Sequence, residues 1–133
     1  MKKLIYILLL GFIFSQDTIY FVYNAKDDPL SVVGDFFHKT LSSKTYPCQL
    51  CKVTYGPFSK KKRWKEFLSS LEYQHEFIYI NRKNDFKNDM NSFPVILFGS
   101  KDKYDVLIST EKINSIKTLD ELIKEINEQL KNK

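Results

Sequence analysis

The stretch Ser92–Ser109, SFPVILFGSKDKYDVLIS, decides the fold that the sequence predicts. Two runs rich in β-branched and aromatic residues, Pro94–Gly99 and Lys103–Ser109, flank the turn residues Gly99–Asp102. Strand-forming runs on either side of a short glycine-containing turn are typical of an antiparallel hairpin. The proline fits the beginning of a strand, because it has no N–H to donate within a sheet.

Apolar spacing elsewhere predicts two further strands and four helices. The strands are 18–25, TIYFVYNA, and 76–81, EFIYIN, both β-branched and aromatic. The predicted helices are an amphipathic helix over 29–42, a short helix with Cys48 and Cys51 in its first turn, a helix capped by Ser59, and a final helix that begins at the capping box Thr118–Glu121. The polar stretch 82–92 is expected to hold one helical turn around Phe86.

The order of these elements predicts an α/β fold with three layers. A strand–helix–strand unit crosses over right-handed and leaves its strands parallel, whereas the later hairpin is antiparallel. The result is a mixed four-stranded sheet with helices on both faces, and it resembles the thioredoxin fold over residues 18–131. Thioredoxin-like proteins have a cis-proline before the third strand, so the resemblance implies a cis Pro94 on the substrate side of the site. The alternative is a trans proline that begins the strand.

The position of the cysteines departs from the thioredoxin pattern. Thioredoxins carry them a few residues after the first strand, but 22 residues separate Ala25 from Cys48, so we expect one extra helix before the Cys-x-x-Cys segment. The segment His38–Gly56, HKTLSSKTYPCQLCKVTYG, also resembles a signature of an uncharacterised bacterial family with a similar Tyr23–Ala25 strand end. That family has no established activity, so this resemblance bears on the fold.

The first residues have the layout of a secretory signal peptide. Met1–Lys3 is a basic head, Leu4–Phe14 is an apolar run of 11 residues, and polarity begins at Ser15. We therefore expect a signal peptide over 1–15 and a single domain over 16–133, exported to the periplasm or secreted. An 11-residue run is short for a membrane span, so no stable membrane anchor is expected after cleavage. The alternative is that this run is a first buried strand.

The charge of the chain gives little support for nucleic-acid binding. The formal net charge of +5 falls to +3 when Lys2 and Lys3 leave with the signal peptide, which is only mildly basic. The run Lys60–Arg63 is interpreted as a solvated face, with an anionic partner as the alternative. No glycine-rich phosphate loop and no hydrolase motif is present, and the sequence does not indicate an oligomeric state.

The only two cysteines, in YPCQLC, have the spacing of a redox pair. The positive end of a helix stabilises a thiolate on the first cysteine, and the second cysteine resolves the mixed disulfide. In this hypothesis Cys48 attacks, Cys51 resolves, the partner is a protein thiol or disulfide, and no cofactor is needed. Export favours an oxidised pair.

Two noncatalytic hypotheses use the same cysteines. In one, Cys48, Cys51 and His38 bind zinc, with His75, an acidic side chain or water as the fourth ligand. In the other, the pair is a structural disulfide or two buried thiols in a partner-binding module, because a fold does not guarantee chemistry. A disulfide that closes so small a ring gains little loop-closure entropy.

Overall fold

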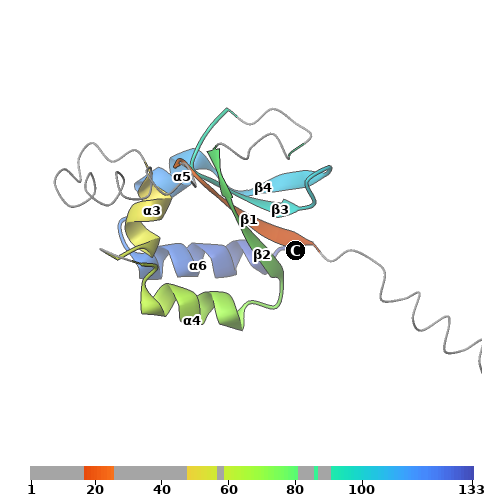
Figure 1. Ribbon diagram of the computed structural model, residues 1–133. Coiled ribbons are helices and arrows are strands. Elements are labelled where there is room, and N and C mark those ends of the chain that lie inside the picture. The colour runs from red at the N-terminus through yellow and green to blue at the C-terminus, as the bar shows by residue number, and fades with distance from the viewer. Residues whose placement is uncertain (1–16, 26–47, 57–58, 81–85, 87–90) are drawn as a thin grey trace, which may run out of the picture.

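A mixed four-stranded sheet lies at the centre of the computed structural model, which describes residues 17–25, 48–56, 59–80, 86 and 91–133 (Figure 1). The strand order is β2-β1-β3-β4. β1 is parallel to β2, whereas β3 is antiparallel to both β1 and β4. The strands are β1 (Thr18–Tyr23), β2 (Gln74–Tyr79), β3 (Val95–Gly99) and β4 (Tyr104–Ile108). This is the predicted thioredoxin-like α/β arrangement.

The predicted hairpin between β3 and β4 is confirmed, and its turn requires a glycine. Gly99 has a φ of 135°, and a Cβ at this position would lie 2.5 Å from the carbonyl oxygen of Lys103. The backbone N–H of Ser100 donates to that same oxygen at 2.9 Å. The turn therefore brings two backbone segments too close for any side chain at position 99.

The described helices pack against one face of the sheet. They are α3 (Gln49–Thr54), α4 (Lys62–Ser70), α5 (Thr110–Ser115) and α6 (Leu119–Leu130). Their buried side chains join those of β1 and β3 in one apolar cluster, in which Trp64 is the largest fully buried side chain. In Figure 1, α3, α4 and α6 lie on the same side of the strands. Burial of an apolar face against a sheet is what stabilises such short helices.

A second apolar cluster lies on the opposite face of the sheet. It consists of buried side chains from three strands and one aromatic side chain from outside the sheet: Tyr20, Val22, Ile78, Val95, Leu97 and Phe86. The Phe86 ring meets the rings of Tyr20 and Tyr104 edge-on, with centroids 5.1 and 5.5 Å apart. The extra helix predicted over 29–42, and with it the third layer, lies outside the described residues.

The final helix follows the prediction closely. Thr118 is the N-cap of α6, and its Oγ1 accepts from the backbone N–H of Glu121 at 3.2 Å. The Glu121 carboxylate in turn accepts from the backbone N–H of Lys117 at 2.8 Å. Both ends of the capping box are thus satisfied, with the glutamate bonded one residue earlier than in the usual pattern.

The predicted cap of the third helix is wrong. α4 begins at Lys62, and its N-cap Lys61 makes no side-chain capping bond. The carbonyl of Ser59 instead accepts from the backbone N–H of Gly56 at 2.7 Å, which closes a turn between α3 and α4. The structure also contains α5, which the sequence pattern did not predict, capped by Ser109.

No helix among the described residues combines the length and apolarity needed to cross a bilayer. The predicted signal peptide over 1–15 lies outside the described residues.

Candidate functional site

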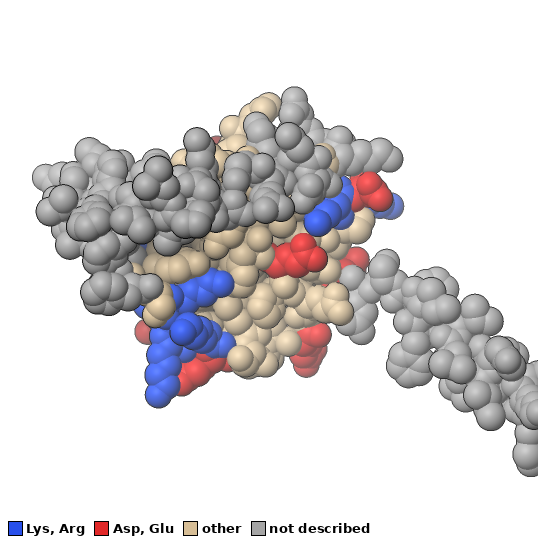
Figure 2. All heavy atoms as spheres, in the orientation of Figure 1, with Lys and Arg blue, Asp and Glu red and all other residues tan. Residues whose placement is uncertain are grey.

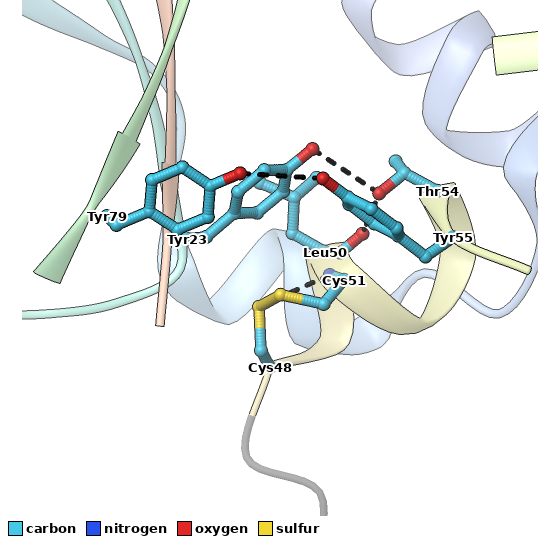
Figure 3. Close-up of a disulfide and its surroundings, with 7 residues drawn as sticks. All are labelled: Tyr23, Cys48, Leu50, Cys51, Thr54, Tyr55 and Tyr79. Atoms are coloured by element: carbon cyan, nitrogen blue, oxygen red, sulfur yellow. Dashed lines mark hydrogen bonds between the residues drawn. A yellow bond between two sulfur atoms is a disulfide. The ribbon is translucent and has the colours of Figure 1, made fainter. Parts of the chain in front are cut away.

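The Cys48–Cys51 pair forms a disulfide at the start of α3 (Figure 3). Cys48 is the N-cap residue with an extended backbone, and the two Cα atoms are 5.2 Å apart. The backbone N–H of Cys51 donates to the Cys48 Sγ at 3.2 Å. The predicted short helix is therefore confirmed, and the first cysteine accepts one of the N–H groups that every helix start leaves without an intrahelical partner.

Both cysteines are buried. The exposed fraction of Cys48 is 0% and that of Cys51 is 5%, and both belong to the cluster on the helix-covered face of the sheet. Nucleophilic exchange requires a sulfur that a partner can reach. The nucleophile hypothesis therefore requires an exposed Cys48 sulfur, which this structure does not have. A partner reaches the disulfide only after the surrounding chain moves.

Hydrogen bonds fix α3 against the sheet beneath it. The Thr54 Oγ1 donates to the carbonyl of Leu50 at 2.7 Å and lies 3.5 Å from the hydroxyl of Tyr23, the last residue of β1. Because the Thr54 hydrogen goes to Leu50, the Tyr23 hydroxyl is the donor in the second contact. Figure 3 shows the Tyr23 and Thr54 hydroxyls turned toward one another. The helix that carries the disulfide is thus joined to the central strand.

Another hydrogen bond connects α3 to the C-terminal helices. The side-chain amide of Gln49, inside the Cys-x-x-Cys motif, donates to the carbonyl of Ile116 at 2.7 Å. Ile116 is the C-cap of α5 and is itself buried in the same cluster. Gln49, one of the two residues between the cysteines, therefore holds the start of α3 against α5.

The topology brings Pro94 to the end of the sheet where α3 lies. The Phe93–Pro94 peptide bond is cis, as the resemblance implied. The next residue, Val95, pairs with Val22, one residue before the Tyr23 that contacts α3. Ile96 and Phe98 face the helix-covered cluster, whereas Val95 and Leu97 face the other cluster. Pro94 itself is buried and stands one residue before β3, at the end of the sheet where Tyr23 contacts α3.

Of the predicted metal ligands, the structure describes Cys48, Cys51 and His75. His38 lies outside the described residues, and His75 pairs with Ile19 near the beginning of β1, at the far end of the strands from Tyr23. Burial, and secondarily the charge of Lys60, lower the pKa of His75. Within the described ranges, no group of three His, Cys, Asp or Glu side chains could hold a metal ion. Zinc binding by a reduced pair with His38 stays a prediction.

Sequence reasoning missed the environment of Lys60. Its Nζ lies 3.2 Å from the centroid of the Phe77 ring and 5.9 Å from that of Tyr55. The sequence shows it only as the first member of the basic run Lys60–Arg63, with no sign that this lysine alone is half-buried. An aromatic residue at the facing position of β2 is the one signal that could have indicated it.

Comparisons with known proteins add no relative: no family model, no curated protein and no solved structure matches this chain.

Proposed function

We propose that this protein is a thioredoxin-like thiol–disulfide oxidoreductase that works through Cys48 and Cys51. The observation that carries the proposal is a disulfide at Cys-x-x-Cys spacing in the first turn of a helix packed on a thioredoxin-like sheet. The contact from the Cys51 N–H to the Cys48 Sγ supports the assignment of roles. A hydrogen bond to a sulfur favours its charged form and therefore makes Cys48 a better thiolate.

The reaction is a two-electron exchange with a protein dithiol. A substrate thiolate attacks the Cys48 Sγ, the Cys48–Cys51 bond breaks, and a mixed disulfide forms while Cys51 leaves as a thiolate. A second substrate thiolate then attacks the substrate sulfur of the mixed disulfide and releases Cys48. The substrate has become a disulfide, and the pair has gained two electrons and, at neutral pH, two protons. The reverse sequence reduces a substrate disulfide.

Burial of the pair favours a second candidate. Cys48 and Cys51 belong to the same core as Trp64, and a sealed disulfide at the start of α3 suits a noncatalytic binding domain. In that case the bond holds the helix start in place and no partner exchanges with it. The two candidates differ in how easily the bond is reduced.

A redox titration separates the two candidates. The purified chain is equilibrated with glutathione or dithiothreitol buffers, and its free thiols are trapped and counted. An oxidoreductase gives a reversible two-electron couple between about −120 and −270 mV, whereas a structural bond stays oxidised to below about −300 mV. The second result would contradict the proposal.

Single substitutions test the assigned roles. Cys48→Ser should abolish exchange with a substrate disulfide, whereas the matched variant Cys51→Ser should accumulate mixed disulfides on Cys48. The reason is that a mixed disulfide on the first cysteine persists when the resolving thiol is absent. Two variants that both exchange as the parent protein does would rule out a reaction through this pair.

Export belongs to the same proposal. The basic head Met1–Lys3, the apolar run Leu4–Phe14 and the polar start at Ser15 support removal of residues 1–15 and release outside the cytoplasm. The N-terminal sequence of the protein recovered from its native cells tests this, and a chain that still begins at Met1 would count against it.

A further inference from the structure

α3 is held more firmly at its C-terminal end than at its start. At the C-terminal end, the Thr54 carbonyl accepts from the backbone N–H of Lys61 at 2.8 Å, and the Thr54 side chain contacts the Tyr23 hydroxyl. Tyr55 forms an antiparallel bridge with Lys60 in the turn that follows. The end of α3 away from the disulfide is therefore joined both to β1 and to the turn before α4.

The start of α3 has one long-range hydrogen bond among the residues that the structure describes. The Gln49 side-chain amide donates to the Ile116 carbonyl at 2.7 Å, and the two residues are 67 positions apart in the sequence. The other hydrogen bonds of this turn stay within α3, such as those from the N–H groups of Cys51 and Lys52 to Cys48. Gln49 is therefore the residue whose hydrogen bond docks the disulfide-bearing turn on the rest of the fold.

The acceptor of this bond is held in place by its own neighbours. The backbone N–H of Ile116 donates to the Ile113 carbonyl at 3.0 Å, at the end of α5. The next N–H, that of Lys117, donates to the Glu121 carboxylate at 2.8 Å. The Ile116 carbonyl therefore belongs to a fixed connection between α5 and α6, and loss of the bond to Gln49 releases the start of α3.

Charged side chains do not provide another attachment for this turn, because Cys48–Cys51 contains no charged residue. Figure 2 shows lysine and arginine side chains gathered at the lower left, where α4 begins, with acidic side chains beside them. Arg63 pairs with Asp120 at 3.0 Å and joins α4 to α6, but both side chains are exposed. Exposed ion pairs contribute little to stability. The Gln49 hydrogen bond and apolar burial therefore hold the first turn of α3.

We propose that Gln49 is a positioning residue for thiol–disulfide exchange at Cys48. Its hydrogen bond to the Ile116 carbonyl keeps the first turn of α3 docked, and exchange takes place from a state in which this bond is broken and the sulfur is exposed. The docked sulfur is out of reach, because the exposed fraction of Cys48 is 0%. The inference rests on the proposed function, since it names what controls the access of a thiol to that pair.

The strength of this one hydrogen bond then sets the rate of exchange. When docking is fast compared with exchange, the rate is proportional to the population of the undocked state. Removal of a hydrogen bond of ordinary strength raises such a population about 2- to 10-fold. Dithiothreitol can replace the substrate dithiol: its thiolate attacks the Cys48 Sγ, and Cys51 leaves as a thiolate. The reagent then closes to a cyclic disulfide, which releases Cys48 and leaves both electrons on the pair.

The test measures the rate at which dithiothreitol reduces the folded protein, with free thiols trapped and counted by mass spectrometry. Gln49→Met, which keeps the side-chain length but cannot donate, should be reduced about 2- to 10-fold faster than the parent. The matched control is Gln129→Met, because the Gln129 amide donates to the Glu125 carboxylate at 3.0 Å within α6, away from the disulfide. The control should be reduced at the parent rate. Equal rates for Gln49→Met and the parent, or equal acceleration by both variants, would overturn the proposal.

Two further measurements separate a local opening from unfolding of the whole chain. Gln49→His places a neutral Nε2–H at about the reach of the amide at about pH 8, so its reduction rate should lie near that of the parent. A histidine variant as fast as Gln49→Met would contradict the role of the bond. Urea below the unfolding transition should raise the parent rate only weakly, because undocking one turn exposes little surface. A rate that rises with urea as steeply as the unfolded population would also contradict the proposal.

The role of Gln49 and the proposed function can fail separately. In the redox titration, a potential outside the catalytic range rejects the oxidoreductase, whether or not Gln49→Met changes the reduction rate. A parent pair within that range whose reduction rate is unchanged by Gln49→Met rejects the role of Gln49 and leaves the oxidoreductase standing.

Discussion

At the scale of single residues, two buried threonine hydroxyls differ in what they contact. The Thr54 Oγ1 donates a hydrogen bond to the Leu50 carbonyl and accepts one from the hydroxyl of Tyr23. The Thr110 Oγ1, at the start of α5, is buried with no hydrogen-bond partner among the residues that the structure describes. A buried polar atom that is bonded stabilises a fold, and one that is not bonded destabilises it. The same substitution should therefore have opposite effects at the two positions.

We predict that Thr54→Val lowers the free energy of unfolding by about 1 to 2 kcal/mol. The substitution removes the hydrogen bond to the Leu50 carbonyl and takes the Thr54 oxygen away from the Tyr23 hydroxyl. Thr110→Val, the matched control, should be neutral or stabilising, since valine has nearly the same shape and no polar atom to bury. Urea unfolding of both variants and the parent measures the difference. An equal loss at both positions would contradict the prediction, because it would show that the hydrogen bonds of Thr54 do not set the effect.

At the scale of elements, the sequence predicted the helices and strands that have strong hydrophobic periodicity. It missed the features that depend on contacts with other parts of the fold. The apolar spacing of the final helix and the alternation in the hairpin identify α6 and β3–β4, because both patterns reflect burial of one face. α5 is six residues long and contributes only Ile113 to the core from within the helix, so no periodicity marks it. Ser59 looked like a cap, but its backbone closes a turn with Gly56, and that choice depends on the packing of α3 against α4.

The residues of the candidate site could be predicted from the sequence, but their burial could not. The spacing of Cys48 and Cys51 and the proline before the third strand are visible in the sequence, and the structure has the disulfide and the cis bond. The burial of Cys48 depends on how α3 docks on β1, through contacts such as that of Tyr23 with Thr54. Residues distant in sequence make those contacts, so the local pattern around the cysteines contains no trace of them.

α3 offers a test of the capping role of Cys48. In a Cys51→Ala background, which removes the disulfide from both proteins, Cys48→Ala should be less stable than Cys48→Ser by about 1 kcal/mol, because serine can accept the N–H at position 51 and alanine cannot. The Cys51 N–H to Cys48 Sγ contact motivates this expectation. Thermal unfolding followed by far-UV circular dichroism measures it, and equal midpoints would mean that α3 needs no cap.

At the scale of the whole molecule, two apolar clusters lie on opposite faces of one sheet. The cluster on the helix-covered face contains the only tryptophan, Trp64, whose ring is 5.2 Å from that of Phe21 on β1. The other cluster contains Phe86 and the alternate residues of the same strand, Tyr20 and Val22. Since β1 contributes to both clusters, neither is expected to persist without the other, and the described chain should unfold as one cooperative unit.

This expectation is tested by a substitution on the face that Trp64 does not contact. Phe86→Ala should lower the free energy of unfolding by about 3 kcal/mol, because it removes a buried ring and leaves a cavity. If the sheet couples its two faces, Trp64 fluorescence and far-UV circular dichroism report the same lowered midpoint. The exposed Val106, on the edge strand β4, supplies the control. Val106→Ala should change the free energy of unfolding by no more than about 0.5 kcal/mol, whichever signal reports it. A fluorescence transition that stays at the parent midpoint while the circular dichroism shifts would divide the molecule into two units that fold separately.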